Sequence, residues 1–438
     1  MAKIADYEKK FQALKSQTSF PELDAEQREL VHELASRYRL TFQELKLLCD
    51  AARDLAMWGE TSLVEWWRDE QPALTRPASK DRFLQTLESR MRSLRSEAKA
   101  YPRQGLEKPA RFTLRPTVEN SDKTIIGMCP VASEETVCCN LRTIDAVENC
   151  GFGCSYCSIQ TFYGDEVAFD ARLAAKLESV ELDPSRFYHF GTGQSSDSLM
   201  WGNQNGVLDA LSEFARKWPN TLLELKTKSK NIEYFLRQRA PRNVVLSWSL
   251  NTPTVIDNEE HFTASLSERL SAARRVVDRG VKVGFHFHPL VYYENWRRDY
   301  AAVAKRLMEE ISFEDVVFLS FGTVTFTKRI VKAIRQRGWS TKMLQMEMEA
   351  AAKGKLSYPS RIKTEMFRAM YQSFAPWHDD VFMYLCMEKR EQWQASFGRA
   401  YDSNEAFETD FGRQVSKKLS PASALPIAGA CSPEPCKS

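Results

Sequence analysis

The second half of the chain alternates short apolar runs with amphipathic segments, which is the pattern of parallel β/α units. The helix at 266–277 is well marked, because Ser265 and Glu268 form a capping box and Gly280 ends its apolar stripe. Right-handed crossovers and short connections favour a full or partial β/α barrel, and an open doubly wound sheet is the alternative. The runs that predict strands are 187–191, 222–228, 244–250, 282–288 and 316–321.

Within these runs apolar and polar residues alternate, so each strand has two different faces. Between Val281 and His288 the odd-numbered residues are all apolar and the even-numbered ones are not. A barrel that is only a scaffold fills its interior with branched apolar side chains. Polar side chains at the strand ends therefore predict an interior binding cavity, because unpaired buried polar groups are costly. The residues concerned are Lys228, Ser249, Asn251, His286 and His288.

The chain divides into three parts by pattern. Residues 1–118 are expected to form a helical domain, with helical spacing of apolar residues over 25–38, 41–57 and 79–100. Its first two helices are interpreted as a helical hairpin, with a helix-turn-helix as the alternative. Residues 119–395 are expected to form the barrel with its substrate-binding region, although 119–148 looks irregular. Residues 396–438 are a C-terminal extension, and its Ser-, Pro- and Ala-rich end beyond about 414 is expected to be disordered.

Composition describes an ordinary globular protein of 438 residues with a net charge of +3. We find no signal peptide and no apolar run near the ~18 residues of a membrane span, so we expect a cytoplasmic protein. Two stretches are basic: 80–115 has ten Lys or Arg against four acids, and 328–342 has no acid and is extended by Lys353, Lys355, Arg361 and Lys363. Such runs usually form solvated surface, but they become candidate phosphate contacts if the substrate is DNA.

Three cysteines, Cys150, Cys154 and Cys157, have C-x3-C-x2-C spacing and follow the apolar run 141–147. Soft thiolate sites usually have four cysteines, whether they hold zinc or an iron–sulfur cluster. A set of three around a cluster leaves one iron open, which is what catalysis needs. A zinc site and inert thiols are the alternatives.

Five of the other cysteines of the ten in the chain lie in two groups. Cys129, Cys138 and Cys139 are interpreted as buried core thiols, and a fourth metal ligand is the alternative. Cys431 and Cys436 lie in the C-terminal tail, where metal binding is a weaker alternative to no role.

The cysteine loop, with Tyr156 directly before its third cysteine, resembles the signature of the radical S-adenosylmethionine superfamily. The resemblance extends to the spore photoproduct lyase family over roughly residues 140–395. It implies an α/β fold, a partial barrel of the TIM type as found in radical S-adenosylmethionine enzymes, after the helical N-terminal domain. The stretches that carry it are Cys154–Thr161, Gly191–Ser198, Glu224–Lys228, Ser247–Asn251, Thr263–Arg274, Gly284–Pro289 and Glu294–Trp296.

The resemblance implies that Cys150, Cys154 and Cys157 hold a 4Fe–4S cluster, which binds S-adenosylmethionine. A one-electron reductant such as flavodoxin or ferredoxin would drive cleavage of this cofactor to a 5′-deoxyadenosyl radical. In the lyase that radical removes hydrogen from a thymine dimer, the spore photoproduct lesion, in damaged DNA, and the resemblance implies a carbon–carbon lyase of this kind. The residues expected to bind the cofactor are Ser196, Asp197, Lys228, Ser249, Asn251 and His288.

Two positions depart from the family and bear on the return of hydrogen to the product. Gln194 stands where the lyase has its cysteine donor, and Ser158 replaces the tyrosine after the third cluster cysteine, so only Tyr156 remains of a tyrosine pair. Cys386 is a candidate replacement donor, with a core thiol as the alternative. Hydrogen would otherwise return from the cofactor. A different nucleotide, RNA or small-molecule substrate is the second functional hypothesis, and a DNA-binding or redox-sensing cluster protein without turnover is the third.

Overall fold

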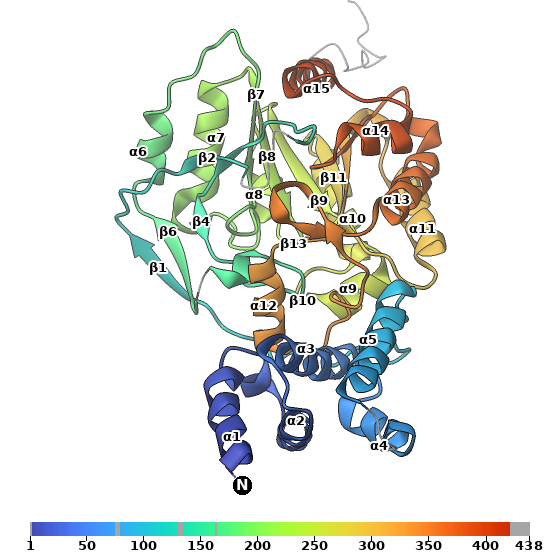
Figure 1. The fold of residues 1–438 in the computed structure, drawn as a ribbon. Coiled ribbons are helices and arrows are strands. Elements are labelled where there is room, and N and C mark those ends of the chain that lie inside the picture. The colour runs from blue at the N-terminus through green and yellow to red at the C-terminus, as the bar shows by residue number, and fades with distance from the viewer. Residues whose placement is uncertain (1, 75–78, 130–134, 163, 421–438) are drawn as a thin grey trace, which may run out of the picture.

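The computed structural model describes residues 2–74, 79–129, 135–162 and 164–420, and Figure 1 shows their arrangement. The N-terminal helices gather at one end of the molecule, below the sheet as drawn. The predicted capping box of Thr41 and Glu44 is present at the start of α3. The helices are α1 (Ala2–Lys15), α2 (Ala25–Tyr38), α3 (Phe42–Trp58), α4 (Leu63–Leu74) and α5 (Lys80–Ser96). The sequence pattern located three of these five, α2, α3 and α5, and missed α1 and α4.

One curved sheet forms the centre of the fold. In the described part of the chain it has eight strands in the order β16–β12–β11–β9–β8–β7–β3–β2. All neighbours from β3 to β16 are parallel, and β2 is antiparallel to β3. From β3 onward each strand lies beside the one before it, as in a β/α barrel that does not close. The strands are β2 (Ile126–Met128), β3 (Arg142–Ile144), β7 (Tyr188–Thr192), β8 (Thr221–Thr227), β9 (Val244–Ser249), β11 (Val283–Leu290), β12 (Val316–Thr323) and β16 (Phe382–Leu385).

The remaining helices connect and cover these strands, as Figure 1 shows. Among them α12 lies between the sheet and α3, so it joins the N-terminal helices to the barrel. They are α6 (Leu173–Glu178), α7 (Val207–Lys217), α8 (Glu233–Arg237), α9 (Pro253–Glu259), α10 (Leu266–Val277), α11 (Trp296–Glu310), α12 (Lys328–Arg337), α13 (Ser360–Ser373), α14 (Arg390–Phe397) and α15 (Asn404–Leu419).

The strand register sorts the side chains into two faces, as the alternation predicted. Paired residues of parallel strands point to the same side of a sheet. Ser249 pairs with His286, and His286 pairs with Ser320, so these polar residues form one row on the inner face. Trp248 and Phe285 form the matching row on the outer face and are fully buried. The barrel interior is therefore polar toward the strand ends.

The structure differs from the sequence-based expectation at two places. The stretch 119–148 is not irregular throughout, because β2 and β3 extend the main sheet and β4 (Val147–Glu148) joins a smaller one. The chain also stays helical beyond residue 414, since α15 runs to Leu419 and buries Phe407 and Phe411 against the barrel. Residues 421–438, with Cys431 and Cys436, lie outside the described residues.

The short strands are β1 (Arg115–Glu119), β4 (Val147–Glu148), β5 (Gly153–Cys154), β6 (Glu166–Asp170), β10 (Glu260–His261), β13 (Thr325–Phe326), β14 (Glu349–Ala350) and β15 (Leu356–Ser357). Strands β13, β15 and β14 form a small antiparallel sheet beyond the end of β12. Among the described helices, none combines the length and the apolar character that crossing a membrane requires.

Candidate functional site

The cysteine loop is fixed to the barrel by strand pairing. Its central residues form β5, which pairs with β10 so that Cys154 lies opposite Glu260. The loop approaches this strand closely at Gly153, where a Cβ atom would lie 3.1 Å from the ring of Phe262. Ser155 then donates its backbone N–H to the Glu259 carbonyl at 2.8 Å. The backbone at Cys154 is therefore held by its neighbours in the fold.

Asn149 ties the start of the loop to the segment after β7. It has a left-handed backbone conformation with φ of 81°, which asparagine tolerates better than most residues. Its side-chain oxygen accepts the Cys150 N–H at 2.8 Å, and its backbone N–H donates to the Ser195 carbonyl at 2.9 Å. The Ser196 hydroxyl donates to the Asn149 carbonyl at 2.6 Å. The sequence reasoning missed Asn149, whose only signal was an asparagine directly before the first cysteine.

Asp197 organises the two loops at the ends of β7 and β8. Its carboxylate accepts four hydrogen bonds, from the backbone N–H groups of Leu199 (3.0 Å), Met200 (2.9 Å) and Lys228 (2.7 Å) and from the Thr227 hydroxyl (2.8 Å). Burial nevertheless raises the pKa of Asp197. In this structure the predicted cofactor residue Asp197 acts by holding these loops in place.

Met200, whose backbone N–H is bound by Asp197, also contacts the first cysteine of the loop, Cys150. Its sulfur lies 3.9 Å from Cys150 Sγ and accepts the Gly151 N–H at 3.3 Å. A Cβ atom on Gly151 would lie 2.6 Å from the Met200 methyl group, so the two residues are in tight contact. The sequence analysis did not identify Met200, because nothing in its local pattern distinguishes it from a core methionine.

A buried charged group lies beneath the second half of the loop. Tyr156 donates its hydroxyl to Glu260 at 2.5 Å, and Arg269 forms an ion pair with the same carboxylate at 2.6 Å. Neither charged side chain is exposed. Burial alone would raise the pKa of Glu260, but the charges of Arg269 and Lys228 outweigh burial and keep it below its ordinary value. Arg269 also donates to the Ser249 carbonyl at 2.8 Å, which links the loop to β9.

The chemistry of the three loop thiols, Cys150, Cys154 and Cys157, decides whether they suit an iron–sulfur cluster. Cys150 is near enough to Cys154 and Cys157 for the charges of these thiols to affect its pKa, which burial raises. Burial raises the pKa of Cys154 to about 12, and the positive charge of Lys228 opposes this rise. The described residues contain no group of three Cys, His, Asp or Glu side chains arranged to hold a single metal ion. The thiolates of an iron–sulfur cluster bind separate irons, and three soft thiols on one fixed loop are donors of that kind. By its chemistry the donor set fits an iron–sulfur cluster.

The structure brings all six predicted cofactor residues to the same end of the sheet, but their side chains differ in availability. Asn251 is buried and already accepts the Tyr300 hydroxyl at 2.7 Å and donates to the Pro289 carbonyl at 3.0 Å. Lys228 is half-buried with its ammonium 5.7 Å from the centre of the Tyr156 ring. His288 is half-buried and shares a hydrogen bond of 2.9 Å with Ser320. Assignment of these residues to a cofactor remains a prediction.

His286 lies on the inner face as predicted, but it belongs to a buried carboxylate–histidine group. Glu224 accepts from His286 at 2.5 Å and from His189 at 2.9 Å. Burial lowers the pKa of His286 to about 4, so its ring is neutral at neutral pH. The pKa of Glu224 lies well below its ordinary value, because its partners outweigh the effect of burial. We interpret Glu224, His189 and His286 as a structural group inside the barrel.

The two candidate hydrogen-donor positions lie at opposite sides of the sheet. Gln194 is half-buried in the loop after β7, where Gly193 has φ of 96° and passes close to the Lys226 carbonyl. Cys386 directly follows β16, and its N–H donates to the Phe321 carbonyl at 2.8 Å. Strands β8, β9, β11 and β12 separate β7 from β16. Ser158, which replaces the family's tyrosine, is exposed.

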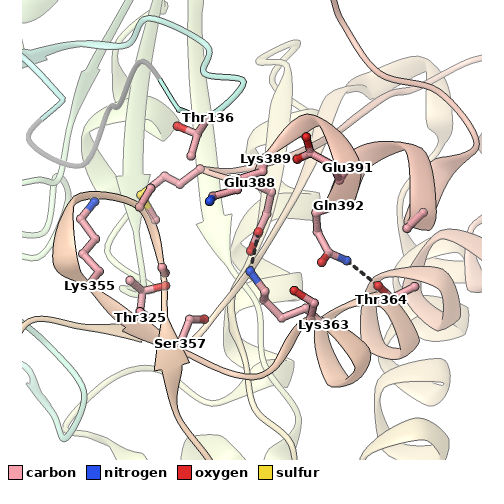
Figure 2. A pocket seen from close by; sticks show the side chains of 16 residues that line it. Thr136, Thr325, Lys355, Ser357, Lys363, Thr364, Glu388, Lys389, Glu391 and Gln392 are labelled. Atoms are coloured by element: carbon pink, nitrogen blue, oxygen red, sulfur yellow. Dashed lines mark hydrogen bonds and ion pairs between the residues drawn. The ribbon is translucent and has the colours of Figure 1, made fainter.

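A cavity of 360 Å³ lies beyond the ends of β12 and β16, as Figure 2 shows. An ion pair of 2.7 Å between Lys363 and Glu388 crosses one wall, and Gln392 donates to Thr364 at 2.8 Å in another. Lys355 lies on the opposite side in this view. The cavity is lined by none of the residues predicted from the motifs, so it is a second feature of the same barrel end.

A family model described as spore photoproduct lyase matches residues 142–369, which is more than half of the chain. The chain belongs to the spore photoproduct lyase family. Among curated members of the spore photoproduct lyase family, the enzyme of Clostridium acetobutylicum is 28% identical over 178 residues, covering 39% of this chain and 53% of the relative. The enzyme of a Geobacillus species is 26% identical over 208 residues, covering 46% and 61%. The chain thus spans between half and two thirds of the length of these relatives.

Solved spore photoproduct lyase structures have the same fold. One is a mutant with bound AdoMet and dinucleoside spore photoproduct, with a TM-score of 0.53, 20% identity, and coverage of 62% of this chain and 82% of that one. A second, complexed with dinucleoside spore photoproduct, gives the same values. Both matches show that the fold is shared. The family match at 142–369 does not include the N-terminal helices.

Proposed function

We propose that this protein is a radical S-adenosylmethionine enzyme that repairs thymine-dimer lesions of the spore photoproduct type in DNA. The observation that carries the proposal is the cysteine loop itself, fastened by β5–β10 pairing beside the polar strand ends of a half barrel. A 4Fe–4S cluster on Cys150, Cys154 and Cys157, with S-adenosylmethionine, would supply radical chemistry through a 5′-deoxyadenosyl radical. The curated and solved relatives support this reading, since they are spore photoproduct lyases.

The protein's part in this chemistry is orientation and exclusion of water. Lys228, Ser249 and His288 are the inner-face residues proposed to contact the cofactor, and Lys228 supplies a positive charge for its carboxylate. Ser196, Asp197 and Asn251 are proposed to act on the cofactor indirectly, because their hydrogen bonds already fix the loops around it. Tyr156 is held by Glu260 and would fix the third cysteine's segment.

The source of the returned hydrogen separates two versions of the cycle. Gln194 has no transferable hydrogen atom of the thiol kind, so the donor is either Cys386 or the 5′-deoxyadenosine formed from the cofactor. A thiol hydrogen exchanges with solvent, whereas a carbon-bound hydrogen of 5′-deoxyadenosine does not. Turnover in D₂O therefore distinguishes them, because only a thiol donor places solvent deuterium in the repaired thymine.

The exposed side of α12 is proposed to contact the phosphates of damaged DNA. Lys328, Arg329 and Lys332 are exposed there. Arg329 lies 4.7 Å from the ring of Phe162, which is 62% exposed just beyond the cysteine loop. The basic surface is thus adjacent to the proposed site. An exposed aromatic ring beside an arginine also suits stacking on a base flipped from the duplex.

Not every residue of the basic stretches is available for DNA. Arg335 is bound to Asp54 at 2.8 Å, and Lys342 is buried and paired with Glu60 at 2.6 Å. Lys99 of the 80–115 stretch is also buried. These three residues hold the N-terminal helices to the barrel, so the proposal rests on the exposed residues of α12.

The decisive experiment is anaerobic turnover with DNA that carries defined lesions. The protein is reconstituted with iron and sulfide and reduced with dithionite or reduced flavodoxin, a member of the proposed class of one-electron donors. Formation of 5′-deoxyadenosine together with repaired thymine is the expected result. Formation of 5′-deoxyadenosine without repair of any thymine lesion would overturn the proposed substrate, and no 5′-deoxyadenosine at all would overturn the enzyme assignment.

A further inference from the structure

Four further cysteines lie together away from the cysteine loop. Cys129 follows β2, Cys138 and Cys139 are adjacent in the segment before β3, and Cys386 follows β16. They come from three chain segments that are as much as 257 positions apart in the sequence. From the sequence, Cys129, Cys138 and Cys139 are interpreted as core thiols or a fourth metal ligand, and Cys386 as a core thiol or a replacement hydrogen donor.

Backbone hydrogen bonds bring these segments side by side. The Cys129 N–H donates to the Leu141 carbonyl at 2.9 Å, which places Cys129 beside the end of the Cys138–Cys139 segment. Val137 forms an antiparallel bridge with Glu388, and its N–H donates to the Glu388 carbonyl at 3.0 Å. Since Cys138 follows Val137 and Cys386 is two residues from Glu388, the bridge joins the other two segments.

The thiols interact with one another and with a cation. Cys139 interacts electrostatically with Cys129, Cys138 and Cys386, and Cys386 interacts with Cys129 and Cys138. Lys355 interacts with the same group. The Cys138 and Cys139 thiols are hydrogen-bonded to each other. No disulfide joins the cysteines of the described chain.

We infer that Cys129, Cys138, Cys139 and Cys386 form a second thiolate site, which binds a thiophilic metal centre, either an iron–sulfur cluster or zinc. Four cysteines are the usual donor set for both. In the described chain these thiols do not converge on one ion, and the same holds for Cys150, Cys154 and Cys157. A multi-iron cluster binds each thiolate at a separate iron, so its ligands need not converge on a single ion. Zinc would have to draw the thiols together.

A cavity lies next to this thiol group. The 360 Å³ cavity at the ends of β12 and β16 is lined by Thr136, Lys355 and Met387, each of which is a close neighbour of the thiol group in sequence or by charge. Met387 has φ of 60°, a conformation that is strained for its side chain and common next to functional sites. Lys355 would partly balance the negative charge of four thiolates.

This inference goes beyond the proposed function and has one consequence for it. A cysteine that ligates a metal has lost its thiol hydrogen. Cys386 in the second site therefore cannot return a hydrogen atom, which leaves 5′-deoxyadenosine as the donor. The barrel would then hold one open cluster at β5 and one closed centre at β16.

Metal content of the full chain tests the inference without reference to activity. After anaerobic reconstitution with ferrous iron and sulfide, purified protein is analysed for iron, acid-labile sulfide and zinc, and by Mössbauer spectroscopy. With both sites filled by 4Fe–4S clusters we expect about eight irons per chain, or about four irons and about one zinc if the second centre is zinc. About four irons and no zinc in the wild-type chain would overturn the second site.

Variants assign the metal to its ligands. C150A/C154A/C157A should keep the second centre's iron or zinc and lose 5′-deoxyadenosine formation. C129S/C138S/C139S/C386S should lose that metal and keep about four irons. Cys49→Ser, a buried cysteine of α3, is the matched control and should retain all metal. A folded C150A/C154A/C157A protein, judged by circular dichroism, that holds neither iron nor zinc would contradict the inference. If that variant does not fold, the wild-type metal count decides.

Discussion

Glu260 accepts both the Tyr156 hydroxyl at 2.5 Å and the Arg269 guanidinium at 2.6 Å, so one buried carboxylate connects the cysteine loop to α10. The carboxylate lies on β10, the strand that pairs with Cys154. The loop is thus held through both backbone and side chain at the same place. The stability of the folded protein should therefore depend on the charge of Glu260.

Glu260→Gln should lower the free energy of unfolding by about 3–5 kcal/mol, because it leaves the buried guanidinium of Arg269 without its charged partner. Urea denaturation of the anaerobic protein measures this loss. The matched control is Glu233→Gln, which breaks an exposed ion pair with Arg237 and should change stability by less than about 1 kcal/mol. Equal effects of the two substitutions would contradict the role given to Glu260.

Met200→Ala should reduce the amount of iron that survives gel filtration after reconstitution. The reason is local, since Met200 is in contact with Cys150 and Gly151 and its removal leaves the first cysteine less constrained. Met370→Ala on α13 is the control, because it removes a buried methionine far from the loop. It should cost about 2–5 kcal/mol of stability but no iron. Similar iron loss in both variants would mean that general destabilisation, not the Met200 contact, is responsible.

Stability should fall as the pH is lowered from about 6.5 toward 4. Burial holds the pKa of His286 at about 4 in the folded protein, against about 6.5 when unfolded. Below pH 6.5 the unfolded chain therefore binds a proton that the folded one does not, and the folded state loses roughly 1.3 kcal/mol per such histidine between pH 7.5 and 5.5. His261 has the same shift to about 4, and burial lowers the pKa of His288 well below its ordinary value.

The variant His286→Gln separates this effect from general acid sensitivity. It removes one of the three histidines in the described chain whose pKa is lowered by burial, His261, His286 and His288, so the difference in the free energy of unfolding between pH 7.5 and 5.5 should shrink by about a third. The midpoint of urea denaturation at the two pH values gives this difference. An unchanged pH difference in His286→Gln would show that this imidazole is not neutral in the folded barrel.

Binding to damaged duplex DNA should depend on salt through the exposed lysines of α12. Replacing Lys328 and Lys332 together by alanine should weaken binding and make the slope of log K against log salt shallower by about 1.8, or about 0.9 per phosphate contact. Lys305→Ala on α11, an exposed lysine paired with Glu309, is the control and should leave the slope unchanged. Fluorescence anisotropy over a salt series measures both slopes. A slope equal to that of wild type in the double variant would exclude α12 as the phosphate contact.

The sequence predicted the barrel strands because each carries its own signal. Residues 281–288 alternate between apolar and other residues, and the pairing of Ser249 with His286 follows once the strands are parallel. It also located the three cysteines, since their spacing is local. It missed Glu260, which lies 104 positions from the Tyr156 that it binds. A contact of that span depends on how the strands are arranged, and neither residue's neighbours in the chain encode it.

Asn149 and the second thiol group were missed for the same reason, because their contacts join segments that are distant in the sequence. Asn149 matters because its side chain and backbone join segments that meet only after β7 has formed beside β3. Cys386 and Cys138 come together because β16 closes the far edge of the sheet near the segment before β3, through the Val137–Glu388 bridge. Pattern along the chain gives the strands, but which strand ends meet around the open side of a half barrel is decided by packing.

Gln194→Cys should change where the returned hydrogen comes from. The position lies in the loop after β7, beside Ser196 and Asp197 and therefore at the proposed cofactor site. With 5′-deoxyadenosine as the natural donor, wild-type turnover in D₂O should give repaired thymine with little deuterium, whereas the new thiol exchanges with solvent and should make most of the product deuterated. Mass spectrometry of the product measures the fraction. Cys386→Ser is the control and should leave the wild-type value unchanged. Heavy deuteration in wild type that disappears in Cys386→Ser would instead identify Cys386 as the donor and remove it from the second thiolate site.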